Sequence, residues 1–177
     1  MPTAAQNDPA PPERLVVGLV SDTHGLVRPE CLDALAGVDL ILHAGDVGGQ
    51  HVLESLGRVA PVAAVHGNVD PSGAPGLTER LTLNLGGLRV HVSHGHEVGV
   101  PTPLRLVERY DADVIVFGHT HRALIERIGR QLVVNPGAAG AARFHLTPSV
   151  ARLVIADGDA QVELVALVSR PRGPLAP

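Results

Sequence analysis

Five times along this chain, a short apolar run ends at once in a loop rich in glycine, aspartate, asparagine and histidine. The runs are aliphatic and β-branched, which is typical of strands buried on both faces of a sheet. The loops read SDTHG, HAGDV, HGNVD, SHGH and GHTH, at residues 21–25, 43–47, 66–70, 93–96 and 118–121. Ligands of α/β folds bind beyond the carboxyl ends of the strands. The pattern therefore predicts that these loops meet and form one ligand site.

The segments between the loops predict an α/β fold. Proline near the start and apolar residues three positions apart mark the helices, and turns that contain glycine mark the hairpins. Because the first half alternates strand and helix and the second half is rich in hairpins, we expect a mixed sheet or two stacked sheets with helices outside. Strands are expected at 15–20, 38–43, 62–65, 81–85, 88–92, 114–117, 123–128, 131–134, 150–155 and 161–168, and helices at 29–36, 51–56 and 103–110.

The length and the ends of the chain predict one domain. With 177 residues, a single core spanning residues 13–169 is expected. The proline-rich stretch 1–12 is expected to be a flexible leader, and 170–177 a flexible tail. No signal-peptide pattern and no apolar run of about 20 residues is present, which predicts a cytoplasmic protein without a membrane partner.

The composition excludes several classes of site. A single cysteine, Cys31, excludes a disulfide framework, a cysteine-rich zinc module and an iron–sulfur cluster. All fourteen basic residues are arginines, so a Walker-type phosphate loop and Schiff-base lysine chemistry are also excluded. The formal net charge of −4 argues against general nucleic-acid binding.

The five loops offer the donor atoms of a metal site. Imidazole nitrogens, carboxylate oxygens and an amide oxygen suit Mn²⁺, Fe and Zn²⁺ better than Ca²⁺ alone or Cu⁺. One ion with four protein ligands would leave three donors unexplained, whereas two ions that share a carboxylate would use all of them. The seven candidate ligands are Asp22, His24, Asp46, Asn68, His94, His119 and His121.

In order and spacing, these motifs resemble the signature of the calcineurin-like metallophosphoesterases. The family pattern D-x-H, G-D, G-N-x-[HD], H and G-H-x-H stands here as Asp22-Thr23-His24, Gly45-Asp46, Gly67-Asn68-Val69-Asp70, His94 and Gly118-His119-Thr120-His121. The similarity extends over residues 15 to about 155 and is strongest to the compact prokaryotic phosphodiesterase branch. It implies an α/β sandwich of two stacked mixed β-sheets flanked by helices.

The resemblance also implies a role for each ligand. Asp22, His24 and His121 would hold a first metal ion, and Asp46 would bridge to a second, held by Asn68, His94 and His119. The cofactors implied are two divalent ions, with Mn first and Fe, Zn or Ni as alternatives. The implied reaction is hydrolysis of a small phosphoester substrate, a phosphodiester first, by a metal-bridging hydroxide.

Four further residues are candidates for catalysis or substrate binding. Many relatives carry a histidine after G-N that helps to protonate the leaving group, but this chain has Val69 and then Asp70. Asp70, which takes this place, and His96, two residues after the ligand candidate His94, are the candidate catalytic residues, although Asp70 could instead position a histidine or a water. His66 and Asn135 are the candidate substrate contacts, and the serine of the family's N-P-G-S is replaced by Ala138.

Two other functions stay open at this point. A phosphomonoesterase would use the same metal ligands, so only the substrate pocket separates it from a phosphodiesterase. A non-catalytic interaction module of this fold is disfavoured because all seven ligand positions are filled. A homo-oligomer is compatible with the sequence.

Overall fold

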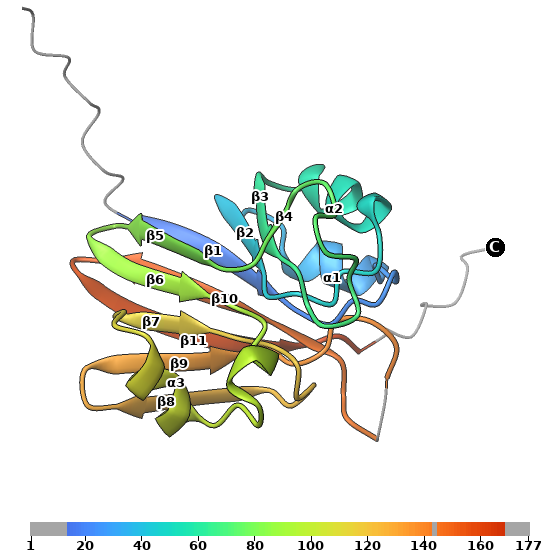
Figure 1. Cartoon of the computed structure of the whole chain (residues 1–177). Helices are drawn as coiled ribbons and strands as arrows, with labels where there is room; N and C mark the ends of the chain where they lie inside the picture. Colours follow the sequence, from blue (N-terminus) through green and yellow to red (C-terminus); the bar gives the residue numbers. More distant parts are fainter. Residues whose placement is uncertain (1–13, 143–144, 169–177) are drawn as a thin grey trace, which may run out of the picture.

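Two mixed β-sheets pack face to face, with helices on their outer faces (Figure 1). The computed structural model describes residues 14–142 and 145–168. The leader and tail expected at 1–12 and 170–177 lie outside these residues. The expected sandwich of two stacked mixed sheets is confirmed.

The first sheet has six strands in the order β11-β10-β1-β2-β3-β4. Its first four strands along the chain, β1 to β4, pair in parallel, while β10 pairs antiparallel with both β1 and β11. The bounds are β1 Arg14–Val20, β2 Leu40–His43, β3 Val62–Val65, β4 Leu77–Thr78, β10 Ser149–Ala156 and β11 Asp159–Ala166.

The second sheet has five strands in the order β5-β6-β7-β9-β8. Its central strands β6, β7 and β9 are parallel, and the outer strands β5 and β8 pair antiparallel with them. The bounds are β5 Leu81–Leu85, β6 Leu88–Val92, β7 Val114–Val116, β8 Leu124–Ile128 and β9 Gln131–Asn135.

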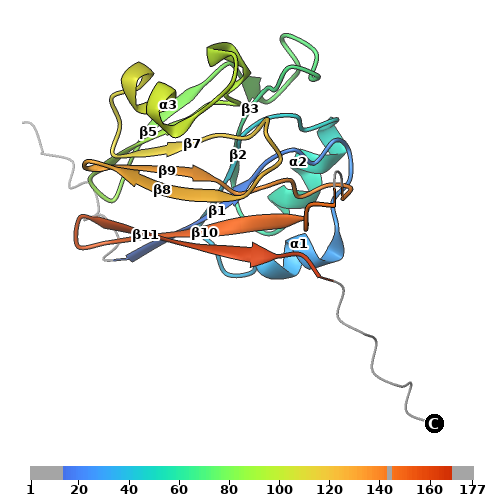
Figure 2. The ribbon, with the colours of Figure 1, turned by 90° about the horizontal axis from the view of Figure 1, so that it is seen from below.

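Figure 2 shows the layers edge-on, with α3 on one side of the sandwich and α1 on the other. Helices α1 (Pro29–Ala34) and α2 (Gln50–Gly57) contribute side chains such as Cys31 and Leu56 to the apolar cluster on the outer face of the first sheet. Helix α3 (Pro103–Arg109) contacts β8 and β9 of the second sheet. None of the helices in the described ranges is long and apolar enough to cross a membrane.

The main core lies between the two sheets. Val17 and Leu19 of β1 meet Val90 and Val92 of β6 and Val116 of β7 there, and all five are buried. The strands in the middle of each sheet are apolar on both faces because a helix layer covers the other face. This double burial fixes the strand ends, and therefore the loops that follow them.

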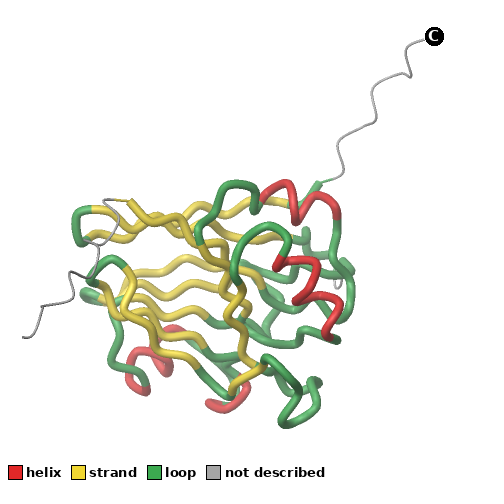
Figure 3. Tube along the Cα trace, turned by 90° about the horizontal axis from the view of Figure 1, so that it is seen from above, coloured by secondary structure: helices red, strands yellow, loops and turns green. Residues whose placement is uncertain are grey.

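The observed elements agree with the sequence-based ones to within a few residues at each end. Two short elements were not expected: the two-residue strand β4 and a 3-10 turn, η1 (His96–Val98). The parallel strands β1, β2, β3, β6 and β7 all end at the same side of the sandwich, and Figure 3 shows loops gathered there. The five polar loops of the sequence follow these strand ends.

Candidate metal centre

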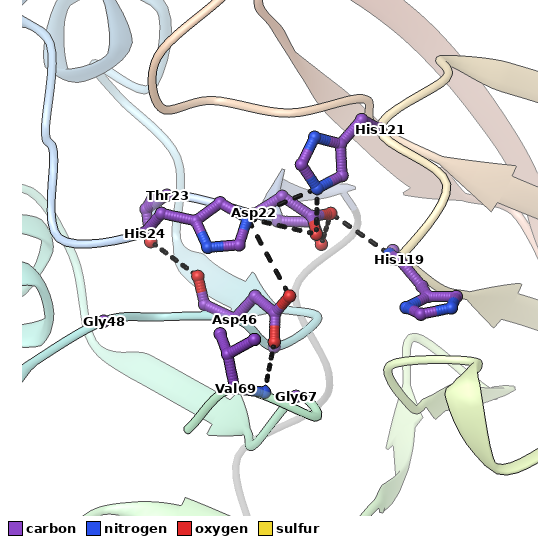
Figure 4. A network of polar contacts seen from close by, with 12 residues as sticks. Asp22, Thr23, His24, Asp46, Gly48, Gly67, Val69, His119 and His121 are labelled. Carbon is purple, nitrogen blue, oxygen red and sulfur yellow. Dashed lines mark hydrogen bonds and ion pairs between the residues drawn. The ribbon is translucent and has the colours of Figure 1, made fainter. Parts of the chain in front are cut away.

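A first group of donor atoms comes from the loops after β1, β2 and β7 (Figure 4). One ligand atom from each of Asp22, His24, Asp46 and His121 lies within 4.8 Å of the others. The Nε2 atom of His121 is 3.1 Å from Oδ1 of Asp22, and Nε2 of His24 is 4.0 Å from the same oxygen. These four side chains surround a space the size of one metal ion.

A second group of donor atoms lies beside the first. The amide oxygen Oδ1 of Asn68 is 3.2 Å from Nε2 of His94 and 3.1 Å from Nδ1 of His119. The rings of His94 and His119 meet edge to face, with their centroids 5.2 Å apart. The structure therefore brings together the three side chains that the resemblance implies for a second ion.

Asp46 belongs to both groups. Its Oδ2 atom is 3.8 Å from Nε2 of His24 on one side and 3.3 Å from Nε2 of His94 on the other. Burial acts to raise the pKa of this carboxyl, but the hydrogen bond and charge of His94 outweigh burial and lower the pKa to about 2. Asp46 is therefore an anion placed between two sets of ligands.

Most of the candidate ligands have an unusual backbone conformation. Seven non-glycine residues have positive φ in the part of the chain that the structure describes, and five are candidate ligands. Aspartate and histidine enter this left-handed region more readily than most residues, but each still stores strain there. Such strain gathers at functional sites. The five angles are 54° at Asp22, 46° at His24, 52° at Asp46, 67° at His119 and 59° at His121.

Two glycines let the loops approach one another closely. A Cβ atom at Gly67 would collide with Oδ1 and the backbone nitrogen of Asp46. A Cβ atom at Gly118 would collide with the hydroxyl of Ser21 and would lie 2.8 Å from Oδ2 of Asp22. A side chain at either position would push a candidate ligand aside. Steric crowding therefore explains why the G-N and G-H pairs of the motifs begin with glycine.

Hydrogen bonds orient the ligands toward the centre. Nδ1 of His94 lies 2.8 Å from the carbonyl oxygen of Ala44, so this nitrogen is the donor and Nε2 is left as the metal-binding atom. Oδ2 of Asp22 accepts hydrogen bonds from the Ser21 hydroxyl at 2.5 Å and from the backbone N–H of His119 at 3.2 Å. Oδ1 of Asp22 is thereby directed to His24 and His121.

Two observations indicate that these residues fit divalent metal ions: a buried carboxylate oxygen without a hydrogen bond, and the kinds of donor atom present. Oδ1 of Asp22 is buried and accepts no hydrogen bond from the residues described, an expensive state for a carboxylate oxygen unless a cation balances it. The combination of carboxylate, imidazole and amide donors matches the preferences of borderline divalent ions. Asp22, His24, Asp46 and His121 would hold one ion, and Asp46, Asn68, His94 and His119 a second.

The histidines of the centre respond to one another electrostatically. Burial acts to lower the pKa of His94, but its hydrogen bond to Asp46 and the charge of Asp22 raise it overall. The pKa of His119 is lowered, first by burial and then by the charge of His94. A proton on one of these two imidazoles therefore disfavours a proton on the other. This favours a neutral ring at His119, which is the form that binds a metal ion.

His43 supports the first loop from behind. It is fully buried, its Nδ1 accepts the N–H of Gly45 at 3.2 Å, and its Nε2 lies 2.9 Å from the Thr23 hydroxyl. The Thr23 hydroxyl in turn donates to the carbonyl oxygen of Val47 at 2.9 Å. Burial lowers the pKa of His43 to about 4, so the ring is neutral. A histidine inside an apolar strand was the only sequence signal for this contact.

Asp70 ties two of the ligand loops together. Its carboxylate accepts hydrogen bonds from three backbone N–H groups, those of Val47 at 3.0 Å, Gly48 at 2.9 Å and Gly67 at 2.9 Å. Val47 and Gly48 follow Asp46, and Gly67 precedes Asn68. These contacts support a positioning role. Proton donation by Asp70 to a leaving group stays a prediction.

The other three candidate residues lie in different surroundings. His66 and His96 are half-buried and line one cavity beside the centre, where their ring centroids are 6.4 Å apart. Asn135 is fully buried, and its amide donates to the carbonyl oxygen of Gly118 at 2.8 Å and to the Thr120 hydroxyl at 3.0 Å. Asn135 thus braces the loop of His119 and His121, and its direct contact with substrate stays a prediction.

Known proteins resemble this chain in sequence. The family model of the calcineurin-like phosphoesterase superfamily domain matches residues 15–158. The chain is 34% identical over 152 residues to the probable metallophosphoesterase MJ0623 of Methanocaldococcus jannaschii, covering 81% of this chain and 77% of that protein. It is 25% identical over 139 residues to phosphodiesterase MJ0936 of the same organism, covering 68% of this chain and 82% of that protein.

Among solved structures, a single mutant of Vps29 from Entamoeba histolytica has a similar fold. The TM-score is 0.70 and the sequence identity 26%, and the match covers 86% of this chain and 99% of that one. The two-sheet fold is therefore shared over most of both chains.

Proposed function

This chain belongs to the calcineurin-like phosphoesterase superfamily, and from that premise we propose that it is a metal-dependent phosphodiesterase with two divalent ions. The observation that carries the proposal is the position of Asp46, whose Oδ2 faces His24 at 3.8 Å and His94 at 3.3 Å. A carboxylate shared between two donor groups is the arrangement that holds two cations a few ångströms apart. Mn²⁺ is the first choice of metal, with Fe, Zn and Ni as alternatives.

Two ions in this place would supply Lewis-acid stabilisation of a phosphoryl group and a nucleophilic hydroxide near neutral pH. The chain's own contribution is to hold seven donors in fixed places. Loops in left-handed conformations, the hydrogen bonds of Asp22 and His94, and the carboxylate of Asp70 together set these positions. Such preorganisation is what a site needs to favour the transition state over the substrate.

A proton must reach the leaving group, and His96 is the residue that we propose for this role. Its ring centroid lies 5.4 Å from that of His94 and 6.3 Å from that of His119, so it borders both the centre and the cavity beside it. His66 lines the same cavity and would contact substrate. The carboxylate of Asp70 is engaged by three N–H groups, which favours His96 over Asp70 as the donor.

Phosphodiesters are proposed as substrates because a relative with 25% identity is named a phosphodiesterase. The test strips the protein of metal, restores Mn²⁺, and compares bis(p-nitrophenyl) phosphate with p-nitrophenyl phosphate. Faster hydrolysis of the diester supports the proposal. Faster hydrolysis of the monoester would establish a phosphomonoesterase instead, and no hydrolysis of either with metal bound would favour a non-catalytic interaction module.

A further inference from the structure

A second polar cavity lies on the outer face of the second sheet, at the edge formed by β5 and β6. Its volume is about 260 Å³, and we call it the arginine cavity. Neither the motifs nor the metal ligands account for it. Its main lining residues are Arg80, Thr82, Arg89, His91, Arg109 and Tyr110.

The strand pattern explains why these side chains share one face. In β5 the leucines at 81, 83 and 85 pack against the core between the sheets, so Thr82 lies on the outer face. Thr82 pairs with His91 of the neighbouring strand, and Arg89 lies on the same outer face two residues before His91. Arg109 and Tyr110 come from the end of α3. Helix α3 contacts β8 and β9, and the cavity lies beyond it, over β5 and β6.

The arginine cavity carries excess positive charge. Arg89 pairs with Asp111 at 3.3 Å, but Asp111 is also shared with Arg130 at 2.9 Å. Within residues 14–142 and 145–168, no carboxylate forms an ion pair with Arg80 or Arg109. Asp111 also lines the cavity, but it is engaged by Arg89 and Arg130, so the guanidinium groups of Arg80 and Arg109 line the cavity without an ion-pair partner among the described residues. Each guanidinium is a planar fork that suits a phosphate.

A buried histidine lies in the wall of the arginine cavity. His91 is only 4% exposed, and its ring stacks on Tyr110 with centroids 3.8 Å apart. Its Nδ1 lies 3.0 Å from the Thr82 hydroxyl, while its buried Nε2 has no hydrogen-bond partner among the residues described. With Thr82 donating to Nδ1, the ring proton is on Nε2, which is buried, so the ring lies in the wall of the cavity and reports on its state without contacting a ligand there.

The arginine cavity shares wall residues with a second cavity that lies toward the metal centre. A neighbouring cavity of about 300 Å³, which we call the histidine cavity, is lined by His66 and His96, by Arg80 and Tyr110, and also by the carboxylates of Glu79 and Glu97. Arg80 and Tyr110 therefore border both cavities. His96 continues the path, since its ring centroid is 6.3 Å from that of His119. One substrate could thus extend from the metal ions, past His96, to the arginines.

We propose that the arginine cavity binds a second phosphate group of the substrate. The substrate class is then a phosphodiester that carries a further phosphate at a distance from the bond that is cleaved. This inference rests on the proposed function for its catalytic half, while phosphate binding by the cavity stands separately. Arg80 and Arg109 are the groups that contact this phosphate, and they determine substrate specificity.

The first experiment compares two matched series of substrates. Both are p-nitrophenyl phosphodiesters of alkanediols with short, medium and long chains; one series ends in a hydroxyl and the other in a phosphate. In the Mn²⁺-loaded protein, the phosphate-terminated compounds should have a kcat/KM about tenfold higher at the best length, since charge-assisted hydrogen bonds are worth that much. Arg80→Gln and Arg109→Gln should each bring this ratio close to one, whereas Arg58→Gln, outside both cavities, should keep it.

The second experiment measures binding without turnover. Inorganic phosphate is titrated into the Zn²⁺-loaded protein while the ring ¹⁵N signals of His91, assigned by their loss in His91→Phe, are followed. A saturable shift that Arg109→Gln abolishes, and that acetate fails to produce, supports the proposal. No shift overturns phosphate binding in the arginine cavity.

The two experiments separate the possible failures. A shift of His91 without any preference for phosphate-terminated substrates overturns the substrate role of the cavity. Absence of the preference in the unsubstituted protein, together with normal hydrolysis of the hydroxyl-terminated series, overturns this inference and leaves the proposed phosphodiesterase intact. Absence of all hydrolysis overturns the proposed function, and the titration then still decides whether the cavity binds phosphate.

Discussion

The Nε2 atoms of His24 and His121 lie 3.3 Å apart. Zinc and similar ions bind imidazole nitrogen at about 2.0–2.1 Å, so two nitrogens on one tetrahedral ion are separated by about 3.4 Å. These residues are 97 positions apart in the chain, and each lies in a loop and has a positive φ itself. The two loops therefore hold the nitrogens at the separation that a single ion requires.

Replacing Asp46 by asparagine should release metal from both halves of the centre. The amide keeps the shape of the side chain but removes the negative charge between His24 and His94. We expect metal content to fall from about two ions per chain to below one, and turnover to fall about 100-fold or more. Inductively coupled plasma mass spectrometry and a phosphodiester assay measure both.

A matched control for that experiment is Asp33→Asn, which changes an exposed aspartate of α1. It should keep both metal content and turnover. If Asp46→Asn bound two ions and turned over normally, Asp46 would not be the bridging ligand.

Asp70→Asn tests whether this carboxylate positions the ligand loops or donates a proton. An amide has one acceptor oxygen, so it cannot accept all three N–H groups of Val47, Gly48 and Gly67. We expect metal affinity to fall about 10- to 100-fold, as for other residues that orient ligands. Metal titration followed by calorimetry measures this. A large loss of turnover with unchanged metal affinity would instead identify Asp70 as a proton donor.

Gly118→Ala should disturb the centre without touching a ligand directly. The new methyl group would collide with the Ser21 hydroxyl and crowd Oδ2 of Asp22, so Asp22 must move. We expect about tenfold weaker metal binding or more. Gly57→Ala is the control, because nothing lies within 4 Å of its Cβ position. It should bind metal normally and raise the free energy of unfolding by about 0.5 kcal/mol.

The sequence predicted that the candidate ligands would meet in one place, because each motif follows an apolar strand directly and the ends of parallel strands are neighbours. It did not predict the order of strands, since pairing between β1 and β10 joins residues more than 130 positions apart. Strand β4 was missed because two residues in a loop of prolines and glycines show no alternation. The arginine cavity was missed because Arg80, Arg89 and Arg109 are dispersed along the sequence and meet only in the fold.

Asn135→Ala should chiefly destabilise the fold. The substitution leaves the carbonyl oxygen of Gly118, the N–H of Gly137 and the Thr120 hydroxyl without their partner in a buried place. Loss of such bonds lowers the free energy of unfolding by about 2–4 kcal/mol. Urea denaturation measures it, with the exposed Asn84→Ala in β5 expected to change stability by less than about 0.5 kcal/mol. Equal effects of the two substitutions would contradict the bracing role of Asn135.

The stability of the metal-free protein should fall in mild acid because of two buried histidines. Burial lowers the pKa of His43 and of His91 to about 4 in the folded chain, from 6.5. The unfolded chain therefore binds more protons, so stability rises with pH across this window and is lost as pH falls from about 6.5 to about 4. Each histidine contributes at most about 3 kcal/mol.

His91→Phe isolates one of these two contributions. Phenylalanine keeps an aromatic ring against Tyr110 but cannot take up a proton. Urea denaturation at several pH values should show a smaller loss of stability between pH 6.5 and 4 than in the parent chain. The same pH dependence in both proteins would mean that His91 titrates normally when folded.

The left-handed conformation of five ligands has a consequence for which residues suit these positions. Glycine and asparagine relieve backbone strain at such positions, and each replacement of a strained residue can stabilise a fold by about 1 kcal/mol. Glycine or asparagine at these five positions would therefore stabilise the backbone at the expense of the donor atoms of the centre. At these five positions, the geometry of the centre and the ease of the backbone therefore favour different residues.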